Sequence, residues 1–506
     1  MSDWFLPEST RPVRAGNAVL PHVHGSDYFA RLVEVIEQTV AGDEVCFTDW
    51  RGDADQLLTD DGPTVASLLG DAARRGVRVR GLLWRSHSDH TSFSAQENAS
   101  LDLDLNDAGA VVLLDERVRR GGSHHQKVVI VRHLKRPQDD VAFVGGIDLC
   151  HSRRDGIEHE GDEQVIPMPP AYGPTPAWHD VHLAVQGPAV YDVETVFRER
   201  WEDTTPLTLN PARRASSLLE SEDETPNRLG PQALPPPSPT DATSAVQVLR
   251  TAPLIGPRGF DFAPDGELSV ASGLVKALAR AERLLYVEDQ YLWSREIGEH
   301  FASALRAQPD LRLVVVLPME PDSEGMGAVV QLYGRSLALD VILAAGQDRV
   351  ALFALSNRAG WPIYVHAKVC IVDDRWASVG SDNLNRRSWS SDSELSCAVV
   401  DERTGASGPA APDAFPVALR RELVAEHLGI GQDAVPTGPH AIFEAMVASA
   451  TALDAWFEGN GRGERPPGQL RRLGRPSLSA MQRRLAKPLY DLAFDPDGTH
   501  RLDRGL

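Results

Sequence analysis

The chain has 506 residues, of which 51 are basic and 72 acidic, so its formal net charge at pH 7 is −21. A hydrophobic content of 42% excludes a wholly disordered chain, and at roughly 150 residues per domain the length allows about three domains. The acidic balance argues against non-specific binding to nucleic acid, because long-range repulsion opposes a polyanion, but it leaves room for one local basic pocket.

The sequence shows no secretory signal, no membrane-spanning segment and no zinc ribbon. The N-terminus has no basic start followed by an apolar segment, and no run of about 18 uncharged apolar residues occurs. We therefore expect no signal peptide, no transmembrane helix and a cytoplasmic protein that is at most peripheral to membranes. Four single, scattered cysteines do not support a zinc ribbon.

Helix-like and strand-like segments alternate in the first part of the chain. Helices are predicted at 27–42, capped by Ser26, and at 64–76. Short apolar runs predict strands at 44–50, 77–84, 110–115, 127–131, 141–146 and 181–185. Residues 1–203 are therefore expected to form a first α/β half.

The segment 204–245 is rich in Pro, Ser and acid, which predicts a linker or a long surface loop. After it the alternation resumes, with helices predicted at 273–284, capped by Ser272, at 299–308 and at 329–345. Strands are predicted at 284–293, 311–318, 349–355, 368–372, 376–380 and 395–400. Residues 246–431 are expected to form a second half, and 432–506 a C-terminal extension without an assigned role.

The two halves show the same order of segments, which indicates an internal repeat. HHQKVVIV, VAFVGGIDL and WHDVHLAVQG in the first half match YVHAKVCIVDD, WASVGSDNL and SDSELSCAVVD in the second. The fold class predicted from this pattern is α/β: two homologous α/β/α sandwiches, with mixed sheets flanked by helices, packed as a pseudo-twofold pair around one active site.

Each repeat carries a His-x-Lys pair at the start of a strand. Side chains at positions i and i+2 of a strand share a face, so His125 points the same way as Lys127, and His366 the same way as Lys368. If the halves pack about a pseudo-twofold axis, both pairs meet in one pocket. There the lysines supply positive charge for a phosphate, while one imidazole attacks phosphorus and the other protonates the leaving oxygen.

Polar residues at matched downstream positions complete the predicted site. Each imidazole needs a partner on its other nitrogen, and Asp180 and Glu394, each just before a strand, fit that task. Asp148, Ser381 and Asn383 lie in or beside the GG and GS turns, where they can approach phosphate oxygens. A negative Asp148 is unfavourable next to a phosphate unless it is protonated or turned aside, so Asn383 is the stronger of the two candidates.

This pattern resembles the phospholipase D superfamily, which is defined by a duplicated HxKxxxxD motif. The second copy is complete, since Asp373 follows His366 and Lys368 at the motif spacing, with GSDNLNRRS and DSE after it. The first copy and its flanks, FVGGIDLC, PAWHDVHLAVQGP and FRERW, are similar to the first half of phospholipases D. The resemblance covers most of residues 17–430.

The first copy departs from the motif at one position. Counted from His125, the motif aspartate would fall at Arg132, and Asp139 or Asp140 in the following turn are candidate substitutes. In the family this aspartate mainly supports the structure of the site, so its replacement puts the geometry of the first copy in doubt without predicting inactivity.

The resemblance implies hydrolysis of glycerophospholipids to phosphatidic acid and a head-group alcohol through a phosphohistidine, with transphosphatidylation as a further outcome. By analogy, His125 is the nucleophile and His366 the acid and base, and Asp373 joins the catalytic set. No metal or cofactor is needed, because the lysines supply the positive charge. The expected partner is a phospholipid at a membrane surface, with no nucleic acid, and the chain is expected to be a monomer.

Three alternatives stay open at this point. A phosphatidyltransferase of the cardiolipin synthase type uses the same motif, although such enzymes usually carry N-terminal membrane helices. A nuclease fits poorly with a net charge of −21. A non-catalytic scaffold would follow if the first copy had decayed at Arg132.

Overall fold

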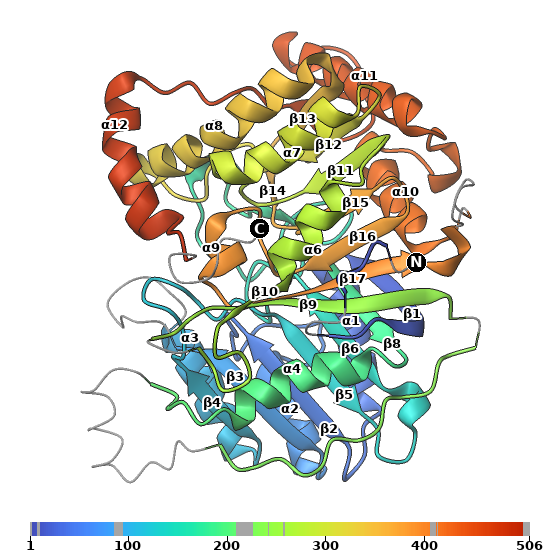
Figure 1. Cartoon of the computed structure of the whole chain (residues 1–506), viewed down its shortest axis with the longest axis vertical. Helices are drawn as coiled ribbons and strands as arrows, with labels where there is room; N and C mark the ends of the chain where they lie inside the picture. The colour runs from blue at the N-terminus through green and yellow to red at the C-terminus, as the bar shows by residue number, and fades with distance from the viewer. Residues whose placement is uncertain are drawn as a thin grey trace.

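Short apolar strands form two mixed sheets, one from each half of the chain, and the helices between the strands pack against these sheets (Figure 1). The structure is a computed structural model, and it describes residues 3–7, 11–85, 95–208, 226–240, 242–256, 259–404, 411 and 413–498. The predicted linker therefore falls partly outside the described residues, at 209–225 and 241, as does the end of the C-terminal extension. The domain boundaries proposed from the sequence stay a prediction.

The first sheet has the spatial order β4–β3–β2–β5–β6–β8–β1, in which β2, β3 and β4 are parallel and the other neighbours antiparallel. Its strands are β1 Arg14–Val23, β2 Glu44–Asp49, β3 Arg78–Trp84, β4 Val111–Asp115, β5 Val128–Arg132, β6 Val141–Gly145 and β8 Val181–Gln186. Its helices are α1 Gly25–Glu37, α2 Val65–Arg74, α3 Ala95–Asp107 and α4 Val190–Glu202, with short turns η1 Pro137–Asp139 and η2 Pro170–Tyr172.

The second sheet repeats this order as β13–β12–β11–β15–β16–β17–β9. Its strands are β9 Ser244–Ala252, β11 Leu284–Glu288, β12 Arg312–Val316, β13 Val350–Ser356, β15 Val369–Val372, β16 Trp376–Gly380 and β17 Glu394–Asp401. Shorter strands are added at its margins: β7 Ala177–His179, β10 Glu267–Leu268, β14 Pro362–Val365 and β18 Leu470–Arg472.

The helices of the second half and of the C-terminal extension cover this sheet. They are α6 Ser269–Leu278, α7 Arg295–Ala307, α8 Gly325–Gly346, α9 Arg386–Ser390, α10 Phe415–Leu428, α11 Pro439–Glu458 and α12 Ala480–Leu489. Short turns are η3 Gln347–Arg349, η4 Glu402–Thr404, η5 Gln432–Ala434 and the π-helical η6 Tyr490–Phe494. The predicted pair of α/β/α sandwiches with mixed sheets is confirmed.

Both predicted N-caps differ from the structure. The first helix begins at Gly25, with His24 rather than Ser26 at its N-cap. The helix predicted to follow Ser272 begins at Ser269, because Val270 and Ala271 already belong to the buried apolar face that continues through the helix.

Apolar side chains lie on both faces of each sheet. One cluster joins α1, α2 and α3 to the outer face of the first sheet, and a second joins α6, α7 and α8 to the outer face of the second. The largest cluster contains inner residues of both sheets together with α4, α10 and α11. This shared core fixes the two halves against each other and so fixes any site that both halves line.

The halves also exchange main-chain contacts. β1 of the first sheet pairs with β9 of the second, which joins the two sheets at their edges. β7 of the first half pairs in parallel with β14 of the second, and a matching parallel bridge joins His124 to Ser393. These two crossed pairings lie directly before the predicted catalytic residues.

Among the described residues one helix, taken with its following turn as Gly325–Arg349, is long and apolar enough to cross a membrane, with a mean hydropathy of 1.4. Half of that window is buried inside the protein, and Ala338, Leu339 and Ile342 belong to the core with α6 and α7. Burial against the second sheet therefore accounts for the apolar character of α8.

Candidate active site

Both His-x-Lys pairs lie where the chain enters the central strands β5 and β15, as the sequence predicted. The ammonium group of Lys127 donates to the carbonyl of His125 over 2.9 Å, and Lys368 makes the equivalent contact to the carbonyl of His366. Both lysines are almost fully buried. The geometry thus holds two cations beside two imidazoles without exposing them to water.

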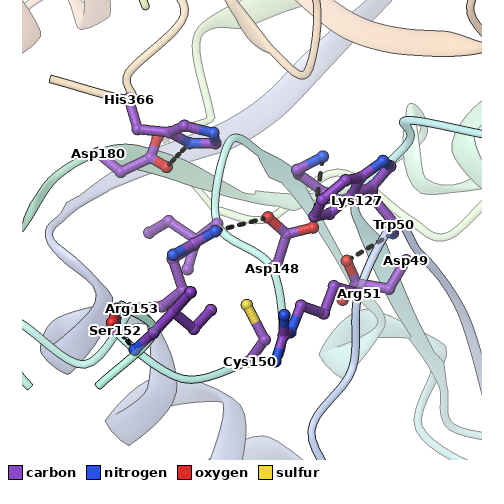
Figure 2. A network of polar contacts seen from close by, with 12 residues as sticks. Asp49, Trp50, Arg51, Lys127, Asp148, Cys150, Ser152, Arg153, Asp180 and His366 are labelled. Carbon is purple, nitrogen blue, oxygen red and sulfur yellow. Dashed lines mark hydrogen bonds and ion pairs between the residues drawn. The ribbon is translucent and has the colours of Figure 1, made fainter. Parts of the chain in front are cut away.

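Each imidazole is paired with a carboxylate from the other half of the molecule. Nδ1 of His125 lies 3.0 Å from Glu394. Nδ1 of His366 lies 2.7 Å from Asp180, and Figure 2 shows this second pair. The sequence predicted both carboxylates as partners but left open which imidazole each one serves. With Nδ1 engaged, Nε2 is the nitrogen left for chemistry on both rings.

Main-chain hydrogen bonds impose this exchange. The amide of His366 donates to the carbonyl of His179 over 2.8 Å, and the amide of His125 donates to the carbonyl of Ser393 over 2.9 Å. Each histidine is therefore tied to the residue that precedes its own carboxylate partner. The β7–β14 pairing and the His124–Ser393 bridge extend these ties.

The positive charges of both halves act on both imidazoles. Burial, followed by Lys127 and Lys368, holds the pKa of His125 well below its usual value. Burial, followed by Lys368 and Arg153, does the same to the pKa of His366. Because each imidazole feels the lysines of both halves, the two predicted pairs share one site.

The same burial shifts the groups around the imidazoles. It raises the pKa of Asp180, and together with the charge of Asp392 it raises the pKa of Glu394 to about 8. It lowers the pKa of Lys368 to about 8. The pKa values of Glu394 and Lys368 therefore lie closer to neutral pH than those of exposed carboxyl and ammonium groups. Shifted pKa values of this kind are typical of catalytic sites.

Asp148 is turned toward cations, as Figure 2 shows. Its carboxylate lies 3.4 Å from Lys127 and 3.6 Å from Arg153. Although burial opposes it, these two cations lower the pKa of Asp148. Asp148 therefore orients Lys127 and Arg153, and the structure gives it no direct place on a phosphate.

Arg153 is a site residue that the sequence reasoning missed. Its guanidinium lies 3.8 Å from the ring centroid of Trp178, its side chain is nearly buried, and it is among the charges that lower the pKa of His366. The signal was present as an arginine pair directly after the GGIDLC turn. Arg153 is therefore a third buried cation, beside Lys127 and Lys368, and its charge acts on His366.

The serine of the GS turn, Ser381, contacts the carboxylate of Glu394. The hydroxyl of Ser381 donates to Glu394 and accepts the amide of Leu395 over 3.1 Å, so Ser381 positions Glu394. The amide of Asn383 donates to the hydroxyl of Ser388 over 3.1 Å, whereas its side-chain oxygen is buried and receives no hydrogen bond from the described residues. This unpaired oxygen is an acceptor, so Asn383 would bind a phosphate oxygen through its side-chain NH2 group and not through this atom.

Asp373 lies at the far end of β15 from His366 and does not join the two imidazoles. Its carboxylate accepts the amides of Glu282, Arg283 and Leu284 over 2.7 to 2.8 Å and so fixes the turn that leads into β11. It is a positioning residue, and its inclusion among the catalytic groups does not match this geometry.

In the first half the aspartate lies beside the other strand. In the second half Asp373, after β15, accepts amides before β11, whereas in the first half the aspartate precedes β2 and accepts an amide after β5. Asp43, in the turn before β2, accepts the amides of Leu134 over 2.8 Å and Val40 over 3.0 Å. Asp140 instead accepts the amide of His133 and pairs with Arg132 over 3.1 Å. The turn is therefore held from the β2 side, which explains how the first copy keeps its form with arginine at position 132.

A buried network of histidines and glutamates lies behind Asp180. Glu426 pairs with His24 over 3.0 Å and with His159 over 2.9 Å, and Glu288 pairs with His179 over 2.7 Å and with His427 over 2.8 Å. Their ligand atoms come within 4.8 Å of one another in two groups that have the residue types of a metal site. Ion pairing and hydrogen bonding account for this arrangement, because every imidazole already faces a carboxylate.

A cavity of about 670 Å³ opens onto this network, lined by His24, Asp155, His159, Glu422 and Glu426 among others. His24 in its lining donates its amide to the carbonyl of Asp180, and neither His125 nor His366 is among the lining residues. The cavity therefore borders the support of the site and not the two imidazoles.

Comparison with known proteins identifies the family. The model of the family described as phospholipase D matches residues 43–332, more than half of the chain, and the cardiolipin synthase, phospholipase D-like domain matches residues 274–407. The chain belongs to the phospholipase D family. The resemblance noted from the duplicated motif is confirmed.

Individual relatives agree with this assignment. Phospholipase D beta 1 of Arabidopsis thaliana is 26% identical over 75% of this chain and 46% of its own length. Phospholipase D1 of Schizosaccharomyces pombe is 26% identical over 72% of this chain and 32% of its own. The chain spans about half the length of the first plant relatives that it matches.

Among solved structures, a phosphatidylserine synthase of Haemophilus influenzae superimposes with a TM-score of 0.52, at 13% identity, over 87% of this chain and 95% of the other. This likeness supports the two-half fold.

Proposed function

We propose that this chain is a phospholipase D-type phosphodiesterase that hydrolyses glycerophospholipids to phosphatidic acid and a head-group alcohol. The observation that carries the proposal is the pair of imidazole–carboxylate contacts crossed between the halves, His125 with Glu394 and His366 with Asp180, beside two buried lysines. Membership of the phospholipase D family supports it.

In the proposed reaction Nε2 of His125 attacks phosphorus and the bond to the head-group oxygen breaks. His366 gives its proton to that oxygen, so the alcohol leaves neutral, and a phosphatidyl group stays on His125. His366 then takes a proton from water, the water oxygen attacks phosphorus, and the bond to His125 breaks. Lys127 and Lys368 neutralise the phosphate oxygens throughout.

Choline release from phosphatidylcholine tests this proposal. We expect the full chain to release choline and His125→Ala and His366→Ala to lose the activity. Substrate labelled in its phosphate should leave an alkali-stable label on the wild-type chain during turnover and none on His125→Ala. Turnover that survives either substitution would contradict the proposal, and no label together with no turnover would favour a non-catalytic scaffold.

Two additions to the same assay test for phosphatidyl transfer and for cleavage of nucleic acid. A primary alcohol in excess reveals transphosphatidylation, and single-stranded DNA reveals nuclease activity, which we expect to be absent. We further propose a cytoplasmic, peripheral and monomeric protein, to be tested by cell fractionation and by light scattering.

A further inference from the structure

α12 and the turn after it present their large apolar side chains to solvent. Met481, Leu485, Leu489 and Leu492 are exposed to 64%, 49%, 45% and 80%, whereas the smaller Ala486 is buried. At 100° per residue, Met481, Leu485 and Leu489 fall on one side of α12, and Leu492 follows in the π-helical turn η6. A helix that only covers a core would bury this side, so the apolar stripe of α12 lacks a cover in the described protein.

The segment that carries the stripe is basic, unlike the rest of the chain. Residues 459–492 contain eight basic residues and two acidic residues, a formal balance of 8 − 2 = +6, in a chain whose net charge is −21. On α12 itself, Arg484 and Lys487 are exposed beside the apolar stripe. An apolar face flanked by cations is the composition of helices that lie in the interface of an anionic membrane.

α12 is connected to the catalytic side of the second half. Tyr490, at the end of the helix, lies edge-on to Trp293 with ring centroids 6.3 Å apart, and Trp293 stacks on Tyr291 at 4.1 Å. The neighbouring Gln290 accepts from Lys368 over 3.4 Å. Figure 1 shows α12 standing out from the body of the second half beside α8.

The chain after α12 strengthens this connection. Asp495 pairs with Arg386 over 3.1 Å and accepts the amide of Arg387 over 3.1 Å, in the short helix α9 that follows Asn383. The base of α12 is thus anchored to the segment that carries a candidate phosphate-binding residue.

We propose that the outer face of α12, formed by Met481, Leu485, Leu489 and Leu492, inserts into the interface of a bilayer that contains anionic phospholipids. The inference rests on the proposed function, because an enzyme that cleaves phospholipids must meet them in a membrane. It names a surface by which a strongly acidic protein binds one: the apolar stripe enters the interface and the flanking cations offset the repulsion between protein and lipid.

Co-sedimentation with vesicles tests the inference. Wild-type chain should sediment with vesicles of phosphatidylcholine and phosphatidylglycerol, more weakly with phosphatidylcholine alone, and less at high salt. The double variant Leu485→Glu, Leu492→Glu should partition about tenfold less or weaker still, because two apolar anchors become charges. The matched control is Leu103→Glu, a leucine on α3 that is 65% exposed and lies in the first half. It should sediment like wild type.

Activity separates this inference from the proposed function. On monomeric short-chain phosphatidylcholine the double variant should match wild type, and on vesicles it should lose about as much activity as binding. Equal vesicle binding by the double variant and wild type, or no binding by wild type, overturns the inference. So does a wild-type dimer that the double variant converts to a monomer, because the stripe would then cover a second copy. A chain that binds vesicles through α12 but cleaves no phospholipid would refute the proposed function alone.

Discussion

At the scale of the residue, the crossed imidazole–carboxylate pairs make each carboxylate important to a histidine of the other half. Asp180 holds Nδ1 of His366 at 2.7 Å and stabilises the protonated ring that must donate to the leaving oxygen. Asp180→Asn should lower kcat by about 10²- to 10⁴-fold with little change in KM. An unchanged thermal midpoint would show that the fold is intact, and a loss below about tenfold would remove Asp180 from this role.

The dependence of the reaction on pH follows from the same buried groups. The pKa of Lys368 is lowered to about 8 by burial, so kcat/KM should fall above pH 8 as this cation is lost. Burial and the lysines hold the pKa of His125 well below the usual imidazole value, so the nucleophile stays neutral and the acid limb should lie below pH 6.5. Burial, Lys368 and Arg153 also lower the pKa of His366 in the free protein, so this ring acts as the acid only once the anionic phosphate of the bound substrate favours its protonated form.

A variant assigns the alkaline limb to one of two groups. The pKa of Glu394 is also raised to about 8, but its ionisation adds a negative charge behind His125 and does not remove the lysine. Glu394→Gln should therefore be slower yet keep the alkaline limb. An alkaline limb that vanishes in this variant would reassign it to Glu394, and an acid limb at the usual imidazole pKa would contradict the electrostatics of the site.

Two aspartates should contribute to stability more than to chemistry. Asp43 and Asp373 each accept backbone amides of turns beside a central strand, among them the partly buried amides of Leu134 and Leu284, and a buried amide left unpaired costs about 1–3 kcal/mol. Asp43→Ala and Asp373→Ala should each lower the free energy of unfolding by about that amount, with kcat of the folded protein within about threefold of wild type. Chemical denaturation measures the first quantity and initial rates the second. A much larger loss of kcat in Asp373→Ala would return this residue to the catalytic set.

At this scale the sequence predicted the residue types well and their partners incompletely. The i and i+2 spacing placed His125 with Lys127 and His366 with Lys368, and the matched positions selected Asp180 and Glu394. Which carboxylate serves which imidazole depends on strand exchange between distant segments, and no local pattern encodes it. Asp43 was missed because it lies far outside the motif, 91 residues before Leu134, whose amide it accepts.

At the scale of the element, the turns after β6 and β16 decide how closely a carboxylate approaches. A methyl group on Gly146 would lie 2.1 Å from Oδ1 of Asp180, whereas the matched Ser381 uses its hydroxyl to hold Glu394. Gly146→Ala should therefore displace Asp180 and lower kcat by about 10²-fold or more, by loss of the His366 pair. Gly431→Ala is the control, since no atom lies within 4 Å of its added methyl group. Equal activity of the two variants would show that the turn tolerates a side chain.

The elements that join the halves are among those that the sequence did not predict. β1 contains Gly16 and Pro21, which weaken a strand pattern, and β9 follows a Pro-rich segment, yet these strands pair and link the two sheets. β7 and β14 are only three and four residues long, too short for a periodic signal. The central strands were predicted because they are apolar on both faces, which is a local property.

At the scale of the whole molecule, one site is built from two halves that exchange partners within a chain. The shared core and the β1–β9 pairing hold both halves of a single chain together, so each molecule completes its own site. A mixture of His125→Ala and His366→Ala should therefore show no more activity than the sum of the two variants measured separately. Assay of the mixture after incubation at high protein concentration checks this. Recovered activity would mean that halves of different chains pair, that a dimer forms the site, and that the expectation of a monomer is wrong. If both variants are folded and no activity is recovered, both imidazole–carboxylate pairs lie within one chain.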